Sequence, residues 1–443
     1  MRNLLLACVL CSLAVCLPAR AQTPLLRRAN QATGLIAERP DWPKDLFAAS
    51  FSRQVSDAQL RAIGVQYFTR NGAVRQVQQV SLKSEHAGTF DLIMEKGTVV
   101  RMNIAVAEQA PWQVTGLVFG LPTPMLRTLD EAWAELAKLP GTVGFGVWKL
   151  GDGAPEPLLQ RNADQPMAVG SAFKLWVLGA LVEEVKAGRR HAADTVRLRE
   201  ERRSLPSGQT QAWPDGSPAT LSTLANLMIS VSDNTATDAL MEALGRERVE
   251  AALPMMGMAD PARTRPFLTT GEMFRLKFVD GGKAGQAWPG LDEAGRRALL
   301  AKGLPSGPLR LDALDPGAFE TPRSIDTTEW FASAADLARA LDWLRRNADG
   351  PAGSDLAVLR GALAIHRGLD ISEKRFPWVG FKGGSEPGVM CLAYLLQSAD
   401  GAWFALAATW NHAAAPLDEM AFTAIVQRAI WLLGEPGPKA TAP

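Results

Sequence analysis

The chain contains a single Ser-x-x-Lys sequence, Ser171-Ala172-Phe173-Lys174, at the start of a predicted helix. Residues three apart on a helix share a face, so the Ser171 hydroxyl and the Lys174 amine can meet. A lysine whose pKa is lowered by burial and by nearby positive charge can act as a general base. The helix N-terminus also offers unpaired backbone N–H groups to a developing anion. We therefore expect Ser171 to be a nucleophile in acyl transfer and Lys174 to be its base.

A second polar segment, Ser232-Asp233-Asn234, separates two predicted helices. The Ser232 hydroxyl could pass a proton to a leaving group, and the Asn234 amide could hold a substrate amide and orient Lys174. The alternative is a structural helix cap, because Ser, Asp and Asn are all favoured caps. Both interpretations place the segment at the start of a helix over residues 235–244.

A third segment, Lys382-Gly383-Gly384-Ser385, lies on a predicted strand. Glycines let a substrate backbone lie close along a strand, and Lys382 offers a fixed positive charge to a carboxylate. The backbone N–H of Ser385, paired with that of Ser171, would form an oxyanion hole. Helix start, interhelix loop and late strand are the places where these three elements of serine acyl-transfer chemistry must lie.

The elements around these segments predict one sheet covered by helices. Hydrophobic periodicity predicts a first strand at 142–150, then mostly helix, then late strands and a closing helix. The first strand should therefore lie beside the late strands. The predicted helices are 129–139, 171–187, 221–230, 235–244, 334–346 and 417–433, and the late strands are 379–383, 388–397 and 403–409.

The N-terminal part predicts a separate small α+β domain. A helix over 45–69 precedes an antiparallel meander of four strands, at 74–82, 88–94, 98–107 and 112–119. Leu121-Pro122-Thr123-Pro124 is typical of a linker. The predicted organisation is a signal peptide (1–21), an extended lead-in (22–43), a small α+β domain (44–120), a linker (121–126), a hydrolase domain (127–433) and a disordered tail (434–443).

Composition narrows the function classes. The formal net charge is +1, so nothing indicates a nucleic-acid partner. Residues 1–21 combine Arg2, a short apolar run and Ala19-Arg20-Ala21, which predicts a cleaved signal peptide, a periplasmic or secreted protein and no stable membrane insertion. Only Cys391 lies outside that segment, and the four histidines are scattered, so we expect no metal and no cofactor.

These motifs resemble the superfamily of class A β-lactamases and penicillin-binding serine hydrolases. The resemblance rests on SAFK, SDN and KGGS over residues 126–433. The strings MISVSDNTATDAL and FKGGSEPGVM resemble more closely a two-domain subgroup known from clavulanic-acid gene clusters. There a ketosteroid-isomerase-like domain precedes a β-lactamase-like domain with an antiparallel sheet and an all-helical subdomain. The resemblance also implies that Phe381 and Met390 line the pocket.

Two departures from the class A pattern stand out. Gly383 occupies a position where those enzymes usually carry a threonine or serine hydroxyl, which Ser385 could replace. The Glu-x-x-Leu-Asn sequence that positions the deacylating water is missing. Glu272 lies at a similar distance, although its setting favours a first-turn acid of a helix. Trp213 could gate the pocket or pack structurally, and Glu329-Trp330 is interpreted as packing and capping.

The expected activity is acyl-enzyme hydrolysis of a small-molecule substrate, either a β-lactam or a related amide or ester. A D-Ala-D-Ala peptidase of cell-wall metabolism uses the same three elements and is the nearest alternative. A penicillin-binding sensor that acylates without turnover is another. A long Gly- and Pro-rich segment over 279–324 is expected to form a lid or wall over the site.

Overall fold

The computed structural model describes residues 23–304, 309 and 316–433. The predicted signal peptide and C-terminal tail lie outside these residues, as does part of the predicted lid. The chain divides between Pro122 and Thr123 into two compact units. None of the described helices is long and apolar enough to cross a bilayer.

The first unit begins with a helix that the sequence did not predict. The expectation of an extended lead-in is wrong, because α1 spans Pro24–Ala32. Thr23 caps it by accepting from the Leu26 N–H, and proline is well suited to the first helical position. Leu25 and Ala29 are buried in the core of the first unit, so packing stabilises this short helix.

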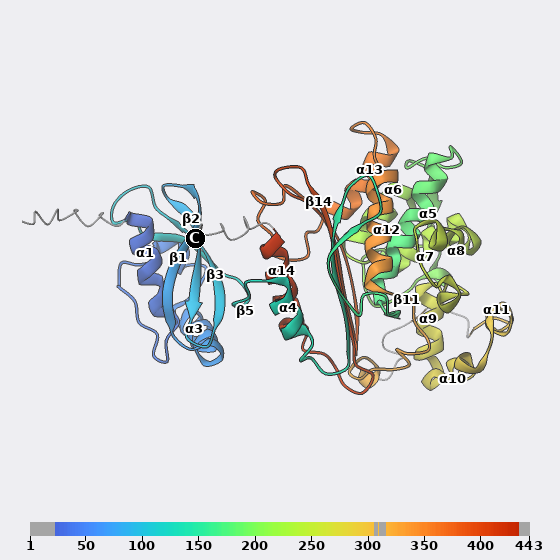
Figure 1. Cartoon of the computed structure of the whole chain (residues 1–443), viewed down its shortest axis with the longest axis horizontal. Coiled ribbons are helices and arrows are strands. Elements are labelled where there is room, and N and C mark those ends of the chain that lie inside the picture. The colour runs from blue at the N-terminus through green and yellow to red at the C-terminus, as the bar shows by residue number, and fades with distance from the viewer. Residues whose placement is uncertain (1–22, 305–308, 310–315, 434–443) are drawn as a thin grey trace, which may run out of the picture. The chain divides into compact units, whose positions relative to one another are not determined.

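The predicted helix over 45–69 is two helices, α2 (Ala49–Ser52) and α3 (Asp57–Asn71). The break occurs because Ser56 and Gln59 form a capping box, which starts a new helix. The meander is present as predicted, with consecutive strands pairing antiparallel in the order β1-β2-β3-β4. Figure 1 labels β1, β2 and β3. The strands are β1 (Val74–Ser84), β2 (Ala87–Met94), β3 (Thr98–Val106) and β4 (Val114–Phe119).

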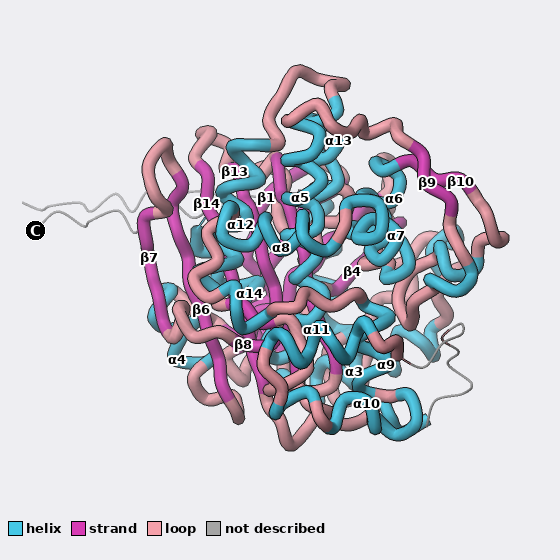
Figure 2. The backbone as a smooth tube through the Cα atoms, turned by 90° about the vertical axis from the view of Figure 1, so that its right-hand side faces the viewer, coloured by secondary structure: helices cyan, strands magenta, loops and turns pink. Residues whose placement is uncertain are grey.

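The second unit is built on a five-stranded antiparallel sheet. Its order is β12-β13-β14-β6-β7, so the first long strand of this unit lies beside the last one, as predicted. Figure 2 shows β7, β6, β14 and β13 side by side. The strands are β6 (Thr142–Leu150), β7 (Glu156–Arg161), β12 (Trp378–Glu386), β13 (Val389–Gln397) and β14 (Trp403–Asn411). The sequence missed β7, an edge strand that is mostly exposed.

Helices cover both faces of this sheet (Figure 1). One face packs against α4 (Leu129–Leu136) and α14 (Glu419–Leu433) in a core of its own. The other face packs against a larger core that includes α5 (Lys174–Lys186) and α12 (Ala334–Asn347). Helices also make up most of the region beyond that face, namely α6 (Leu221–Ser230), α7 (Asn234–Leu244), α8 (Arg246–Met255), α9 (Thr270–Lys277), α10 (Lys283–Gln286), α11 (Glu293–Ala301) and α13 (Asp355–Gly361).

The element that carries the Ser-x-x-Lys sequence differs from the predicted continuous helix. Gly170–Phe173 form a 3-10 turn, and the α-helix α5 begins at Lys174. Gly170 has a φ of +47°, a conformation that favours glycine. Almost every residue of α5 is buried, so the helix is a central element that holds its N-terminal end fixed.

Candidate active site

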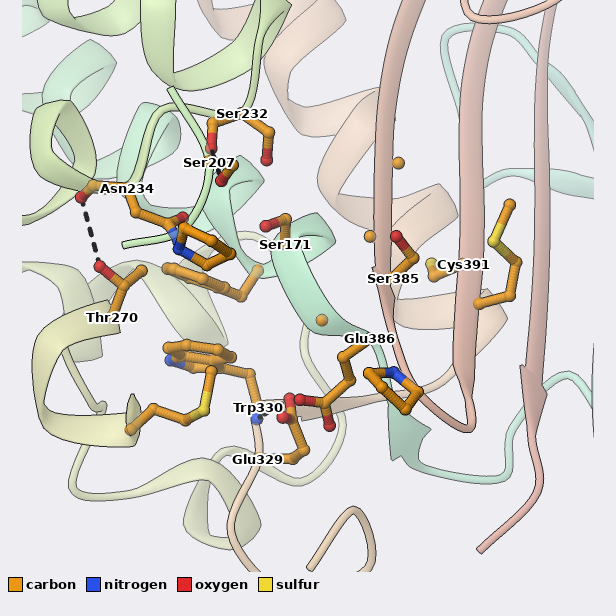
Figure 3. A pocket seen from close by; sticks show the side chains of 18 of the residues that line it. Ser171, Ser207, Ser232, Asn234, Thr270, Glu329, Trp330, Ser385, Glu386 and Cys391 are labelled. Atoms are coloured by element: carbon orange, nitrogen blue, oxygen red, sulfur yellow. Dashed lines mark hydrogen bonds between the residues drawn. The ribbon is translucent and has the colours of Figure 1, made fainter. Parts of the chain in front are cut away.

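Ser171 lines a cavity of about 460 Å³ in the second unit. Ser232 and Asn234 from the loop before α7 line the same cavity, as do Gly383, Gly384 and Ser385 from β12. Figure 3 shows Ser171 between Ser207 and Ser232 on one side and the Ser385 strand on the other. The structure thus brings together three segments that are far apart in the sequence.

Lys174 is fully buried and is held by the Ser232-Asp233-Asn234 loop. Its Nζ lies 2.7 Å from the Ser232 carbonyl oxygen, 3.0 Å from Ser232 Oγ and 2.6 Å from Asn234 Oδ1. Burial, followed by the nearby charge of Lys382, holds the pKa of Lys174 well below its usual value. The neutral amine required of a general base is therefore accessible at lower pH than for an ordinary lysine.

Ser232 lies between two lysines. Lys382 Nζ is 3.0 Å from Ser232 Oγ, the same distance as Lys174 Nζ. Burial lowers the pKa of Lys382 to about 7. Ser232 has a φ of +57°, a strained conformation for a residue with a side chain, and such strain is found at functional sites.

Asp233 fixes the loop that carries Ser232 and Asn234. It is fully buried and caps α7 by accepting from the Ala236 N–H. Its carboxylate also accepts hydrogen bonds from the backbone N–H groups of Gln209 and Thr210 and from the Thr210 hydroxyl. Capping and chemistry are therefore not alternatives in this segment, because Asp233 caps the helix while its two neighbours reach Lys174.

The backbones of Gly384 and of the turn at Gly170–Phe173 are in close contact. A Cβ atom placed on Gly384 would collide with the Val169 carbonyl and lie 2.6 Å from the Ser171 nitrogen. A Cβ on Gly170 would lie 3.1 Å from the Ser385 nitrogen. The backbone nitrogens of Ser171 and Ser385 are thus near each other where β12 contacts the 3-10 turn. An oxyanion hole requires two such donors side by side.

The remainder of the cavity wall is largely aromatic. Phe173, between the Ser and Lys of the motif, stacks on Trp330 with ring centres 3.8 Å apart. Phe274, Phe278 and Phe319 pack against one another and also line the cavity. Phe319 belongs to the segment 279–324, which we predicted to form a lid or wall, and it lines the cavity. Phe381 and Met390 line it as well, as the family resemblance implied.

Two acids in the wall were missed as functional candidates. Glu329 and Glu386 line the cavity, and each carboxylate lies 2.6 Å from the Lys277 ammonium, which is fully buried. The interpretation of Glu329-Trp330 as packing and capping is thus incomplete. Ser207 was also missed; its hydroxyl donates to the Ser232 carbonyl at 2.7 Å. No local sequence pattern marks these residues, because their partners are distant in the chain.

Two predicted candidates lie elsewhere. Glu272 pairs with Arg246 at 2.6 Å and forms a capping box with Thr269, so it is the first-turn acid of α9. Trp213 is half-buried against the larger core. Neither residue lines the cavity that contains Ser171. Within the described ranges, no group of three or more His, Cys, Asp or Glu side chains could hold a metal ion.

Residues 128–347 match the protein family described as the beta-lactamase enzyme family. The second unit is β-lactamase-like. The matched residues include the Ser171 and Ser232 segments and end before Lys382, so the third segment of the β-lactamase-like unit is assigned from geometry alone. The two-domain subgroup with a ketosteroid-isomerase-like first domain stays a prediction, because the match does not reach the first unit.

Several solved structures resemble the chain. They include a β-lactamase from Sphaerobacter thermophilus (21% identity, TM-score 0.46, covering 69% of this chain and 94% of that one). A β-lactamase from Desulfarculus baarsii has 20% identity and a TM-score of 0.44, covering 69% and 96%. PBP-A has 16% identity and a TM-score of 0.44, covering 69% and 96%. A comparison with curated protein sequences gave no match.

Proposed function

We propose that the chain is a serine hydrolase that forms an acyl-enzyme on Ser171 and acts on a β-lactam or a related small amide or ester. The observation that carries the proposal is the position of Ser232 Oγ, 3.0 Å from both Lys174 Nζ and Lys382 Nζ, beside the cavity that Ser171 lines. A hydroxyl between two amines can accept a hydrogen bond from one and donate to the other. This arrangement suits a proton relay next to a nucleophile.

In the acylation step, neutral Lys174 takes the Ser171 proton as Oγ bonds to the substrate carbonyl carbon. The Ser171 and Ser385 backbone N–H groups stabilise the oxyanion of the tetrahedral intermediate. As that intermediate collapses, the bond to the leaving group breaks and Ser232 relays the proton to it. The Ser232 carbonyl and Asn234 Oδ1 accept hydrogen bonds from Lys174, and the ammonium formed in this step can pass its proton to Ser232 Oγ, 3.0 Å away.

In the deacylation step, water attacks the acyl carbon, the bond to Ser171 Oγ breaks, and one water proton returns to Oγ. Class A enzymes use a dedicated glutamate for this step. Glu272 pairs with Arg246 outside the cavity, so it is not proposed for that role. We therefore expect β-lactam turnover to be slow and a short acyl ester to be the better substrate.

Turnover of three matched substrate classes tests this function. We expect a short acyl ester to be hydrolysed faster than a chromogenic cephalosporin, and a D-Ala-D-Ala peptide to be the poorest substrate. Ser171→Ala should abolish all turnover above the solution rate. Unchanged turnover in Ser171→Ala would contradict the proposal, and peptide as the best substrate would favour the cell-wall alternative. A penicillin adduct that persists, with no turnover of any substrate, would favour the sensor.

A further inference from the structure

The cavity continues from Ser171 to a region that combines aromatic rings with two carboxyl groups. Figure 3 shows the Glu329 and Glu386 carboxyl groups facing each other beside Trp330. Glu386 directly follows Ser385 on β12, and 15% of its side-chain surface is exposed, whereas the Glu329 side chain is fully buried. Glu386 is therefore the acid that a molecule in the cavity can reach.

The charges in this region do not balance when both acids are ionised. Among the described residues, the ammonium of Lys277 pairs with both carboxylates, at 2.6 Å from each. Burial and then the Glu329 carboxyl raise the pKa of Glu386 well above its usual value. For Lys277 the lowering by burial is outweighed by the two carboxylates, so its pKa is raised. A proton or a cation supplied from the cavity would relieve the excess negative charge.

No cationic side chain of the cavity wall competes for this position. Among the described residues that line the cavity, the charged side chains are Glu329 and Glu386, and none is a lysine, arginine or histidine. Arg323 is nearby, but its guanidinium lies over the Phe278 ring, 5.6 Å from the ring centre. Aromatic faces themselves attract cations, with quaternary ammonium groups as the best-known ligands.

We propose that Glu386 and the surrounding aromatic rings bind a basic group on the acyl portion of the substrate. The inference rests on the proposed acyl-enzyme chemistry and adds a substrate class to it: amides or esters whose acyl chain ends in an ammonium. Glu386 acts as a specificity-determining residue. The positive group offsets the negative charge that Lys277 leaves unbalanced, and Phe274 and Trp330 contribute ring faces.

Matched p-nitrophenyl esters test this proposal. One ester carries a trimethylammonium group at the end of its acyl chain, and its isostere carries a tert-butyl group, so that carbon replaces nitrogen. A third carries a terminal carboxylate, and all are made with several chain lengths. For the best chain length, we expect a kcat/KM about tenfold higher for the ammonium ester than for its isostere. This is the size of effect expected when one ion pair forms in a site shielded from bulk water. The carboxylate ester should be the poorest.

Glu386→Gln should bring the ammonium-to-isostere ratio close to 1, and Glu293→Gln, on the exposed face of α11, should leave it unchanged. Phe274→Leu, which keeps both acids, should lower the ratio partially. A wild-type ratio near 1, or a ratio unchanged by Glu386→Gln, overturns the inference. If no ester is hydrolysed in a Ser171-dependent way, the proposed function itself fails, so the two failures are distinguishable.

Discussion

Lys174 is the residue whose protonation state decides the proposed chemistry. Its amine is fully buried and has three oxygen neighbours within 3.0 Å, all from Ser232 and Asn234. In water a lysine is almost entirely protonated at neutral pH and cannot accept a proton. Burial and the positive charge of Lys382 both disfavour the protonated form of Lys174. Two features of the fold thus favour the neutral amine that a general base requires.

The charge of Lys382 provides a test with a defined sign. Removing it in Lys382→Met should raise the pKa of Lys174, because the charge of Lys382 lowers that pKa in the wild type. A smaller fraction of Lys174 is then neutral at a given pH, so the acid limb of the kcat/KM profile should move to higher pH. We also expect about a 100-fold loss of kcat/KM at the optimum, since Ser232 loses a partner.

Lys382→Arg serves as the control, because an arginine stays protonated at this position. Its acid limb should not move to higher pH even if its maximal rate is lower. An acid limb in Lys382→Met that stays in place or moves to lower pH would contradict the role of Lys382 as a modulator of Lys174.

Residues of this site could be predicted from the sequence where one short segment contains more than one reactive side chain. Ser171 and Lys174 are three residues apart, so one short stretch of sequence supplies both the predicted nucleophile and its predicted base. Glu386 gave no such signal, because its partner Lys277 is 109 residues away in the chain. A buried charge network of this kind arises from tertiary packing and has no local pattern.

The contact between β12 and the 3-10 turn before α5 is the element-scale feature that aligns the backbone donors. Gly384 permits this contact, because a side chain there would meet backbone atoms of Val169, Ser171 and Ala172. At Gly383 the nearest atom to an added Cβ would be the end of the Phe381 ring, at 2.9 Å. A ring can move by a few tenths of an ångström, whereas the backbone of a helix start cannot easily do so.

Paired glycine substitutions test this contact. Gly384→Ala should push β12 away from the turn and misplace the Ser385 N–H, with a loss of at least 100-fold in kcat, the typical effect of losing one oxyanion donor. Gly383→Ala should cost less than about tenfold. Thermal unfolding of both variants checks that they fold. Equal activity of the two variants would contradict the proposed oxyanion hole.

The prediction of helices failed where tertiary packing stabilised a helix that the local sequence pattern did not indicate. Strong periodicity located α6 at Leu221–Ser230 and α12 from Ala334, because a wide apolar face defines each helix. The lead-in contains Pro24 and polar residues, so its pattern did not indicate a helix, yet packing of Leu25 and Ala29 stabilises α1. The capping box at Ser56 was a readable signal for the break between α2 and α3.

At the scale of the whole molecule, every residue of the proposed site lies in the β-lactamase-like unit. β12 at the edge of the sheet contacts the Ser171 turn, although the two are about 200 residues apart in the chain. The general sheet arrangement could be predicted, because a first strand and late strands of similar apolar character pair in one sheet. The function of the first unit could not be predicted from its sequence.

Covalent labelling of the full chain tests the convergence of these segments on Ser171 most directly. A fluorophosphonate probe should add one label per chain, and peptide mapping should place it on Ser171. Labelling should be lost in Ser171→Ala and slowed at least 100-fold in Lys174→Ala, which removes the proposed base. A label of equal yield in Ser171→Ala, or one that maps to another residue of the wild type, would contradict the assignment of Ser171 as the nucleophile.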